Sequence, residues 1–146
     1  MIRPRQLAVA AALVATFVVA TPVFAASSTI HIGKPTLAAK VLVTVPVNVT
    51  CQPINGDTAL DLGGMSTTTL QVIQANGKQV ANASDFMFGP VTCDGTTVNH
   101  LVFQVIATTV PYHHGSAVVQ LKLDIEDPNS CCTTPDNATV TKVVTL

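Results

Sequence analysis

The sequence predicts an all-β protein, a single antiparallel β-sandwich of about seven to eight strands that follows an N-terminal signal peptide. Short segments rich in Val, Thr and Ile alternate apolar and polar residues, which is the pattern of half-buried strands. Clusters of Gly, Asn, Asp and Pro separate these segments at close spacing and mark turns. No segment after the leader has the helical period, so we expect strands alone.

The N-terminal leader has the three parts of a cleavable secretory signal. A basic start, Met1 to Arg5, precedes an apolar stretch from Leu7 to Ala20, and small residues surround Ala25. We expect cleavage after Ala25 or one residue later, because the apolar stretch is shorter than the roughly 20 residues that span a bilayer. The predicted domains are a signal peptide over residues 1–25 and a sandwich over residues 26–146, secreted or at the cell envelope, with no membrane span in the mature chain.

The charge of the mature chain excludes two classes of partner. Cleavage removes both arginines of the sequence, Arg3 and Arg5, and leaves five lysines against eight carboxylates. A domain with a formal charge of about −3 lacks the basic face that nucleic acid or an anionic membrane requires. We therefore expect another protein or a cell-surface component as partner, and no nucleic acid.

The clearest strand runs from Val41 to Cys51, where the odd positions are Val or Cys and most even positions are polar. Pro46 cannot donate to a ladder, so this strand is expected to change partners there, to lie at an edge or to carry a bulge. A shorter strand, Ser28 to Ile32, precedes it. Residues 52–66 are rich in turn formers and predict a loop with at most one short strand.

Three hairpins are expected in the second half of the domain. The first joins Thr67–Gln74 to the segment that starts at Lys78 through Asn76-Gly77, a strong hairpin signal. The second has Asp94-Gly95 at its tip, and Pro111 to Gly115 forms the third. The strands that flank these turns are predicted over residues 78–83, 88–93, 98–108 and 117–125, followed by a last strand over residues 138–146.

In the predicted strand over residues 117–125, apolar and polar residues alternate, which assigns them to two faces. Ala117, Val119, Leu121, Leu123 and Ile125 share one face, which we expect to be buried. The polar residues between them, Gln120, Lys122 and Asp124, are then expected to face water.

Two elements carry a resemblance to a known class of proteins. Val47-Asn48-Val49-Thr50-Cys51 and Val91-Thr92-Cys93-Asp94-Gly95-Thr96 resemble a pattern of small immunoglobulin-like sandwich proteins that bacteria, actinobacteria in particular, secrete. The resemblance implies a fold and a location more than an activity. The chain has no tryptophan, and Val91 stands where immunoglobulin domains carry a tyrosine.

Four cysteines in an exported chain form an even set, for which three pairings are open. Cys51 and Cys93 each belong to a strand pattern, and their pairing is favoured over cross-pairing with the other two. Cys131 and Cys132 are adjacent, and a bond between them would be strained. Such a bridge would either hold a loop rigid or serve as a redox-labile or ligand-contacting site. A third possibility is that one of the two cysteines forms a disulfide with another molecule.

Two sets of side chains are candidate metal ligands. His113 and His114, with His100 and His31 from other strands, offer imidazoles for zinc or copper. No motif of fixed spacing accompanies them, so a solvated hairpin tip is the favoured interpretation.

The second set is acidic. Asp124 and Glu126 share a strand face, Asp127 follows, and Asp136 lies just beyond the adjacent cysteines. Carboxylates at the loop end of a sandwich can hold Ca²⁺. The spacing of a calcium loop is absent, so an ordinary strand end is favoured.

No catalytic set is recognisable in the sequence. Gly115-Ser116 lacks the context of a nucleophile elbow, and no Ser, His and Asp occur in a familiar order. We expect no enzymatic activity and no cofactor. The leading hypothesis is a module that presents loops or a sheet edge to another macromolecule. The alternative is a carrier of a small ligand or of a Ca, Cu or Zn ion at the loop ends.

Overall fold

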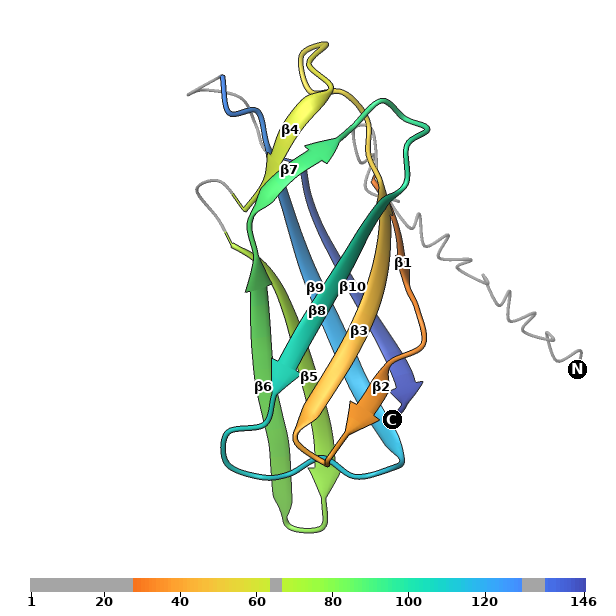
Figure 1. Cartoon of the computed structure of the whole chain (residues 1–146), viewed down its shortest axis with the longest axis vertical. Helices are drawn as coiled ribbons and strands as arrows, with labels where there is room; N and C mark the ends of the chain where they lie inside the picture. Colours follow the sequence, from red (N-terminus) through yellow and green to blue (C-terminus); the bar gives the residue numbers. More distant parts are fainter. Residues whose placement is uncertain (1–27, 64–66, 130–135) are drawn as a thin grey trace, which may run out of the picture.

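The computed structural model describes residues 28–63, 67–129 and 136–146, which form two antiparallel sheets and no helix (Figure 1). This confirms the all-β sandwich, with ten strands in the described part instead of about seven to eight. The predicted signal peptide, Cys131 and Cys132 lie outside the described residues. The strands are β1 (Thr29–Ile32), β2 (Thr36–Ala38), β3 (Leu42–Thr50), β4 (Ala59–Leu62), β5 (Thr68–Asn76), β6 (Gln79–Met87), β7 (Gly89–Thr92), β8 (Asn99–Ile106), β9 (Ser116–Glu126) and β10 (Asp136–Thr145).

The four-stranded sheet is built around β3. β8 pairs with one edge of β3, while β1 and then β2 pair with the other. The ladder with β1 ends at Val47 and the ladder with β2 begins at Thr44, so β3 changes partners at Pro46, the first of the three predicted alternatives. The Pro46 carbonyl accepts a hydrogen bond of 2.8 Å from Gly33 N in the connection between β1 and β2. The missing N–H of the proline falls on the same side, where neither ladder needs a donor.

The six-stranded sheet is built around β9. One edge of β9 pairs with β10 along ten residues, and the other edge pairs with β5 and, beyond it, with β4. β6 extends the sheet beside β5, and β7 extends it beside β4. β5 and β6 form the expected hairpin with Asn-Gly at its turn, where Gly77 has a φ of +60°.

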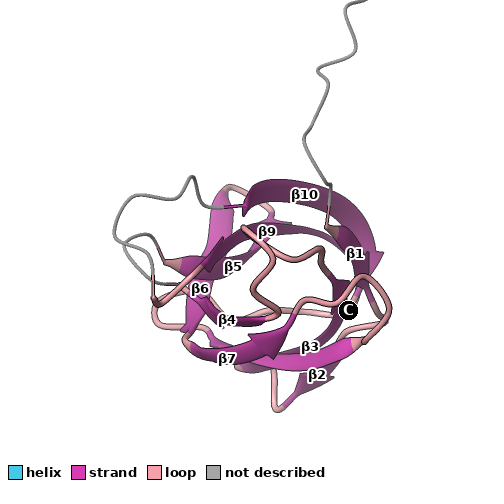
Figure 2. Cartoon of the chain, turned by 90° about the horizontal axis from the view of Figure 1, so that it is seen from above, coloured by secondary structure: helices cyan, strands magenta, loops and turns pink. Residues whose placement is uncertain are grey.

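The two sheets face each other across a core of alternating side chains (Figure 2). Tyr112 is the largest fully buried residue, and its hydroxyl donates a hydrogen bond of 3.2 Å to Val72 O. Burial raises the pKa of this phenol. Other fully buried members come from both sheets: Val43, Val45, Val49, Phe103 and Val105 from the first, and Leu70, Val72, Val119, Leu121, Leu123 and Ile125 from the second.

Two of the three predicted hairpins are wrong. β7 and β8 belong to different sheets, and so do β8 and β9, so both connections cross from one sheet to the other. In the first crossing, the Asp94 carboxylate accepts hydrogen bonds from the N–H and hydroxyl groups of Thr96 and Thr97. The same Asp-Gly turn therefore stabilises an arch between sheets as well as it would a hairpin.

The predicted disulfide between Cys51 and Cys93 is present. Cys51 follows β3 and Cys93 follows β7, so the bond links the two sheets near one end of the molecule. Both cysteines are buried. The loop that it closes is 42 residues long, which constrains the unfolded chain. No helix in the described part of the chain is long and apolar enough to cross a membrane.

Candidate functional site

The sandwich has two seams, at which an edge strand of one sheet meets an edge strand of the other. We call them the β1/β10 seam and the β6/β8 seam. No backbone ladder joins β1 to β10, or β6 to β8, within the described residues. Figure 2 shows β1 and β10 as neighbours at the first of these seams.

β10 is a long edge strand with an interrupted apolar face. Its inner edge pairs with β9 over ten residues, while its outer edge has no strand partner within the described residues. Ala138, Val140 and Val144 pack against the core at every second position. Lys142 occupies the third position of this series, between Val140 and Val144, where alternation calls for an apolar residue.

Two side chains hold the β1/β10 seam in place of a ladder. Lys142 Nζ donates a hydrogen bond of 2.6 Å to Ile32 O, the carbonyl of the last residue of β1. Ser28 Oγ, just before β1, donates to Asp136 Oδ2 at the start of β10. Residue numbers rise together between the two contacts, so β1 and β10 run parallel.

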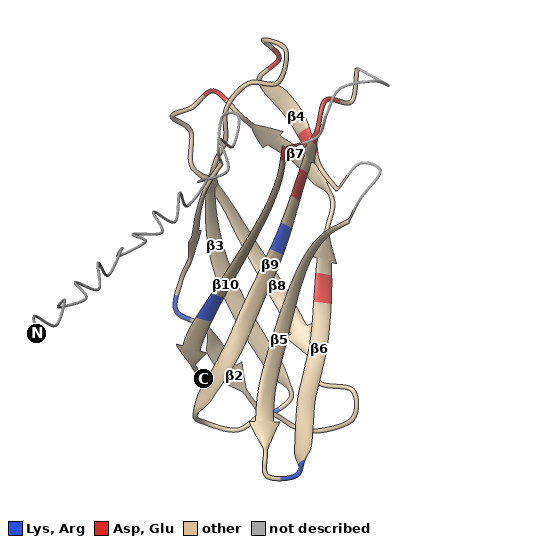
Figure 3. Cartoon of the chain, turned by 180° about the vertical axis from the view of Figure 1, so that it is seen from behind, with Lys and Arg blue, Asp and Glu red and all other residues tan. Residues whose placement is uncertain are grey.

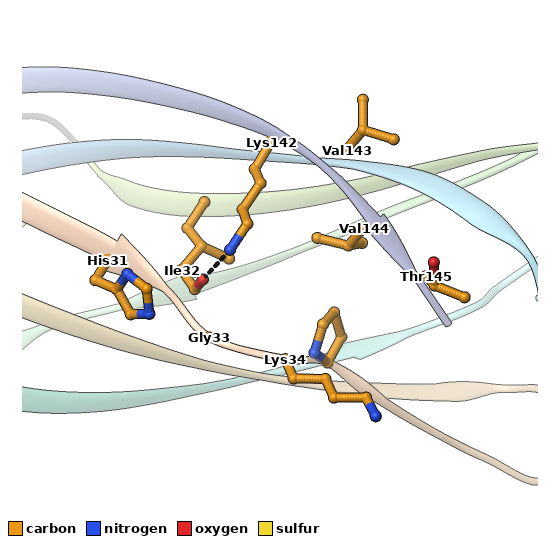
Figure 4. A pocket seen from close by; sticks show the side chains of 9 residues that line it. His31, Ile32, Gly33, Lys34, Lys142, Val143, Val144 and Thr145 are labelled. Carbon is orange, nitrogen blue, oxygen red and sulfur yellow. Dashed lines mark hydrogen bonds between the residues drawn. The ribbon is translucent and has the colours of Figure 1, made fainter.

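A groove of about 320 Å³ opens at this seam, between the end of β1 and the last residues of β10 (Figure 4). It contains two of the five lysines of the chain, Lys34 and Lys142, together with His31. None of the described residues that line it carries a side-chain carboxylate. The groove is therefore cationic in a chain of negative net charge. Its lining is completed by Ile32, Gly33, Pro35, Val143, Val144 and Thr145.

Gly33 shapes one wall of the groove. A Cβ at this position would lie 2.9 Å from Pro46 Cγ, closer than side chains tolerate. Glycine therefore lets the connection between β1 and β2 lie flat against β3. This path brings Pro35 into a buried position and leaves Lys34 exposed at the rim.

The charges are separated along the long axis of the molecule (Figure 3). Figure 3 shows the Asp and Glu residues gathered mainly toward the end that carries β4 and β7, where Asp61 and Glu126 stand opposite each other in register. The Lys residues lie on β9, on β10 and in turns toward the other end. The groove thus belongs to the cationic half.

The predicted metal ligands lie at opposite ends of β9. His113 and His114 precede this eleven-residue strand, whereas Asp124, Glu126 and Asp127 lie at or beyond its end, roughly 30 Å away. They do not form one site. Among the residues that the structure describes, no group of three or more His, Cys, Asp or Glu side chains is arranged to hold a metal ion.

The imidazoles before β9 are directed at backbone carbonyls. His113 Nε2 lies 3.1 Å from Ala75 O and its Nδ1 lies 3.0 Å from His114 O. His114 Nδ1 lies 3.3 Å from Leu146 O. These contacts tie the crossing between the sheets to the β5–β6 hairpin and to the C-terminal residue.

The other two histidines, His31 and His100, lie apart from this pair. They flank Asn48 in one row across β1, β3 and β8, and His100 Nδ1 lies 2.8 Å from Asn48 Oδ1.

One predicted exposure is wrong, because Asp124 is completely buried instead of facing water. It shares the outer face of β9 with Lys122, which is exposed as predicted. β10 flanks Asp124 on one side through Asn137. On the other side, Gly63 N and the Thr68 hydroxyl both donate to Asp124 O. Alternation along one strand does not reveal such covering by neighbouring segments.

Sequence reasoning missed the residues that form the groove, except for His31. A signal was available, because a lysine interrupts the apolar series Ala138, Val140 and Val144 in the last strand. An inward-pointing charge is a known mark of an edge strand. The proximity of β1 to this edge had no signal in the local sequence.

Comparison with protein-family models found no match, and comparison with curated proteins found none either. A crystal structure of a protein from Archaeoglobus fulgidus is similar to this chain with a TM-score of 0.40 and 10% sequence identity, over 82% of this chain and 95% of that chain. A likeness at this level carries no argument about function.

Proposed function

We propose that this protein is a secreted or cell-envelope binding module with an immunoglobulin-like fold and without catalytic activity. The N-terminal leader supports export. The disulfide between Cys51 and Cys93 supports an oxidising compartment and, because it joins the two sheets, an immunoglobulin-like sandwich. The lack of a recognisable nucleophile and base in the sequence supports a binding role.

The observation that carries this proposal is the open edge of β10 beside the cationic groove. An unpaired strand edge offers a row of N–H and C=O groups to another chain. Adding a strand to such an edge is a recurrent way to bind a protein. The partner on this proposal is another protein or a protein component of the cell surface, and its contact is the β1/β10 seam.

Site-specific photo-crosslinking tests the proposal on the native cell surface. Val143 is 70% exposed at the groove, and Val80 is 56% exposed on β6, away from it. A benzophenone amino acid replaces either residue in the full-length protein. We expect a discrete crosslinked product from position 143 and none from position 80. Free monomer alone from both positions would overturn the proposal.

The alternative function is a carrier of a small ligand or of a metal ion. The volume of the groove, about 320 Å³, falls within the range of small-ligand pockets. Native mass spectrometry of protein purified from its own medium separates the two functions. A carrier shows an added mass that is lost on unfolding, whereas a binding module for macromolecules has the mass of the processed chain.

A further inference from the structure

We infer that the groove of the β1/β10 seam binds an extended peptide that bears a carboxylate, inserted as a strand between β1 and β10. This inference rests on the proposed binding function and names the chemistry of its partner. Lys142 is the residue that selects the peptide.

The two edges of the seam are bridged by side chains instead of a ladder. Lys142 reaches across from β10, and its Nζ lies 2.6 Å from Ile32 O (Figure 4). At the other end of the seam, Ser28 Oγ donates to Asp136 Oδ2. The two backbones are therefore not paired with each other, and their edges can pair with an added strand.

Both edges have polar backbone groups that face the groove. Among the residues that the structure describes, β10 pairs with β9 alone and β1 pairs with β3 alone, each through one edge. Side-chain contacts replace a ladder at both ends of the seam. An inserted strand would supply donors and acceptors to both edges, which is the source of affinity in strand addition.

The charge of the lining selects a carboxylate. Lys142, Lys34 and His31 line the groove, and no acidic side chain does. Ile32 O accepts one of the three N–H donors of the Lys142 ammonium group. Insertion of a strand breaks this contact, and a peptide carboxylate replaces it with a stronger, charge-assisted hydrogen bond.

An apolar contact adds a second preference. Val143 is 70% exposed, and the adjacent Val144 and Ile32 are buried at the inner side of the groove. Alternate residues of an inserted strand point inward and outward. The peptide therefore has an apolar residue at alternate positions and a carboxylate near Lys142.

The inward-pointing lysine also explains why this edge does not pair with any strand at random. A charged residue on the inner face of an edge strand disfavours indiscriminate pairing. A strand without a carboxylate loses the contact between Lys142 and Ile32 O without replacing it. Lys142 thus favours binding of peptides that carry a carboxylate over those that do not.

The probes are peptides selected on the protein itself. A displayed library of random peptides of about nine residues is panned against the full mature chain, and the most enriched peptide is synthesised. Two analogues accompany it, one with Asn or Gln in place of the carboxylate residue and one with N-methyl groups at alternate backbone amides. We expect enriched peptides with a carboxylate and alternating apolar residues, and loss of binding on N-methylation.

The decisive quantity is the ratio of affinities of the acidic peptide and its neutral analogue. We expect a ratio of about ten in the native protein, as for a hydrogen bond to a charged group. In Lys142→Gln the ratio falls to about one, whereas Lys78→Gln, in the β5–β6 turn, retains it. A purely structural effect of the substitution changes both affinities together and leaves the ratio intact.

Several outcomes overturn the inference. They are the absence of any enriched peptide, a ratio unchanged in Lys142→Gln, undiminished binding of the N-methylated peptide, or a second copy of the chain occupying the β10 edge in sedimentation experiments. The crosslink from position 143 tests the proposed function separately. If a partner is captured at position 143 but the ratio of peptide affinities does not depend on Lys142, the proposed binding function stands and the inserted strand is refuted.

Discussion

The two seams of the sandwich have the same construction but opposite chemistry. At the β6/β8 seam, Asp85 of β6 accepts a hydrogen bond of 2.8 Å from Gln104 N of β8. At the β1/β10 seam, Lys142 of β10 donates to Ile32 O of β1. In each case a charged residue interrupts the inward face of an edge strand in the six-stranded sheet, and its charge matches the backbone group that it meets.

The surroundings of the two charges differ. Asp85 is half-buried and also accepts a hydrogen bond from its neighbour Phe86 N, which fixes the carboxylate at both oxygens. Lys142 is exposed and makes its contact across an open, cationic groove. A charged side chain therefore bridges one seam from a half-buried position, where it accepts two hydrogen bonds, and the other through a hydrogen bond at an exposed position. The difference is set by how many partners the charge has and by its access to water.

The largest expected effect acts on both seams together. Replacing Cys51 and Cys93 with alanine removes the link between the sheets, and the free energy of unfolding should fall by about 4 kcal/mol for a loop of 42 residues. Chemical denaturation measures the loss. Native protein in a reducing agent is the control and should show a similar loss. A decrease below ~1 kcal/mol would mean that the sheets are held in place without the bond.

The next effect belongs to the β6/β8 seam. Asp85→Ala should lower the free energy of unfolding by about 1.5 kcal/mol, because two N–H groups lose a charged acceptor in a partly solvated place. Asp85→Asn keeps one acceptor oxygen and should cost about half as much. Equal losses in the two variants would contradict a role for the hydrogen bond to Gln104. Chemical denaturation of both variants makes the comparison.

A smaller loss of stability is expected at the β1/β10 seam. Lys142→Met keeps most of the aliphatic stem and removes the donor, so the free energy of unfolding should fall by only about 0.5 kcal/mol at this exposed position. Lys122→Met on β9 is the matched control. Sedimentation should show more self-association in Lys142→Met than in the control, because the β10 edge has lost its charge. Identical behaviour would argue that Lys142 does not protect the edge.

The smallest effect concerns the arch between the sheets. Hydrogen bonds from the Thr97 N–H and hydroxyl, and then from Thr96 N–H, hold the pKa of Asp94 well below its ordinary value. This contribution is present above the ordinary pKa of about 4 and is lost as pH falls below it toward the folded value. The difference in Tm between the native protein and Asp94→Asn should shrink as the solution is acidified. Thr97→Val, which loses one donor, should show an intermediate pH dependence.

Local pattern predicted much of this fold. Alternation identified the buried face of β3 and of β9 as far as Ile125, and Asn-Gly marked the β5–β6 turn. Pro46 marked an irregularity of β3, which proved to be its change of partners. The pairing of Cys51 with Cys93 also followed from their places in strands. These features depend on residues that are close in sequence and on backbone geometry with a period of two.

Tertiary structure alone decided which sheet each strand joins and what lies at the seams. A turn such as Asp94-Gly95 has the same local chemistry in a hairpin and in an arch, so it did not reveal that β7 and β8 lie in different sheets. The burial of Asp124 depends on segments that meet β9 from both sides. The groove exists because β1 and β10, at opposite ends of the domain sequence, become neighbours without pairing. The strand faces and the disulfide could be predicted from sequence, whereas the long-range placement of strand edges creates the candidate site.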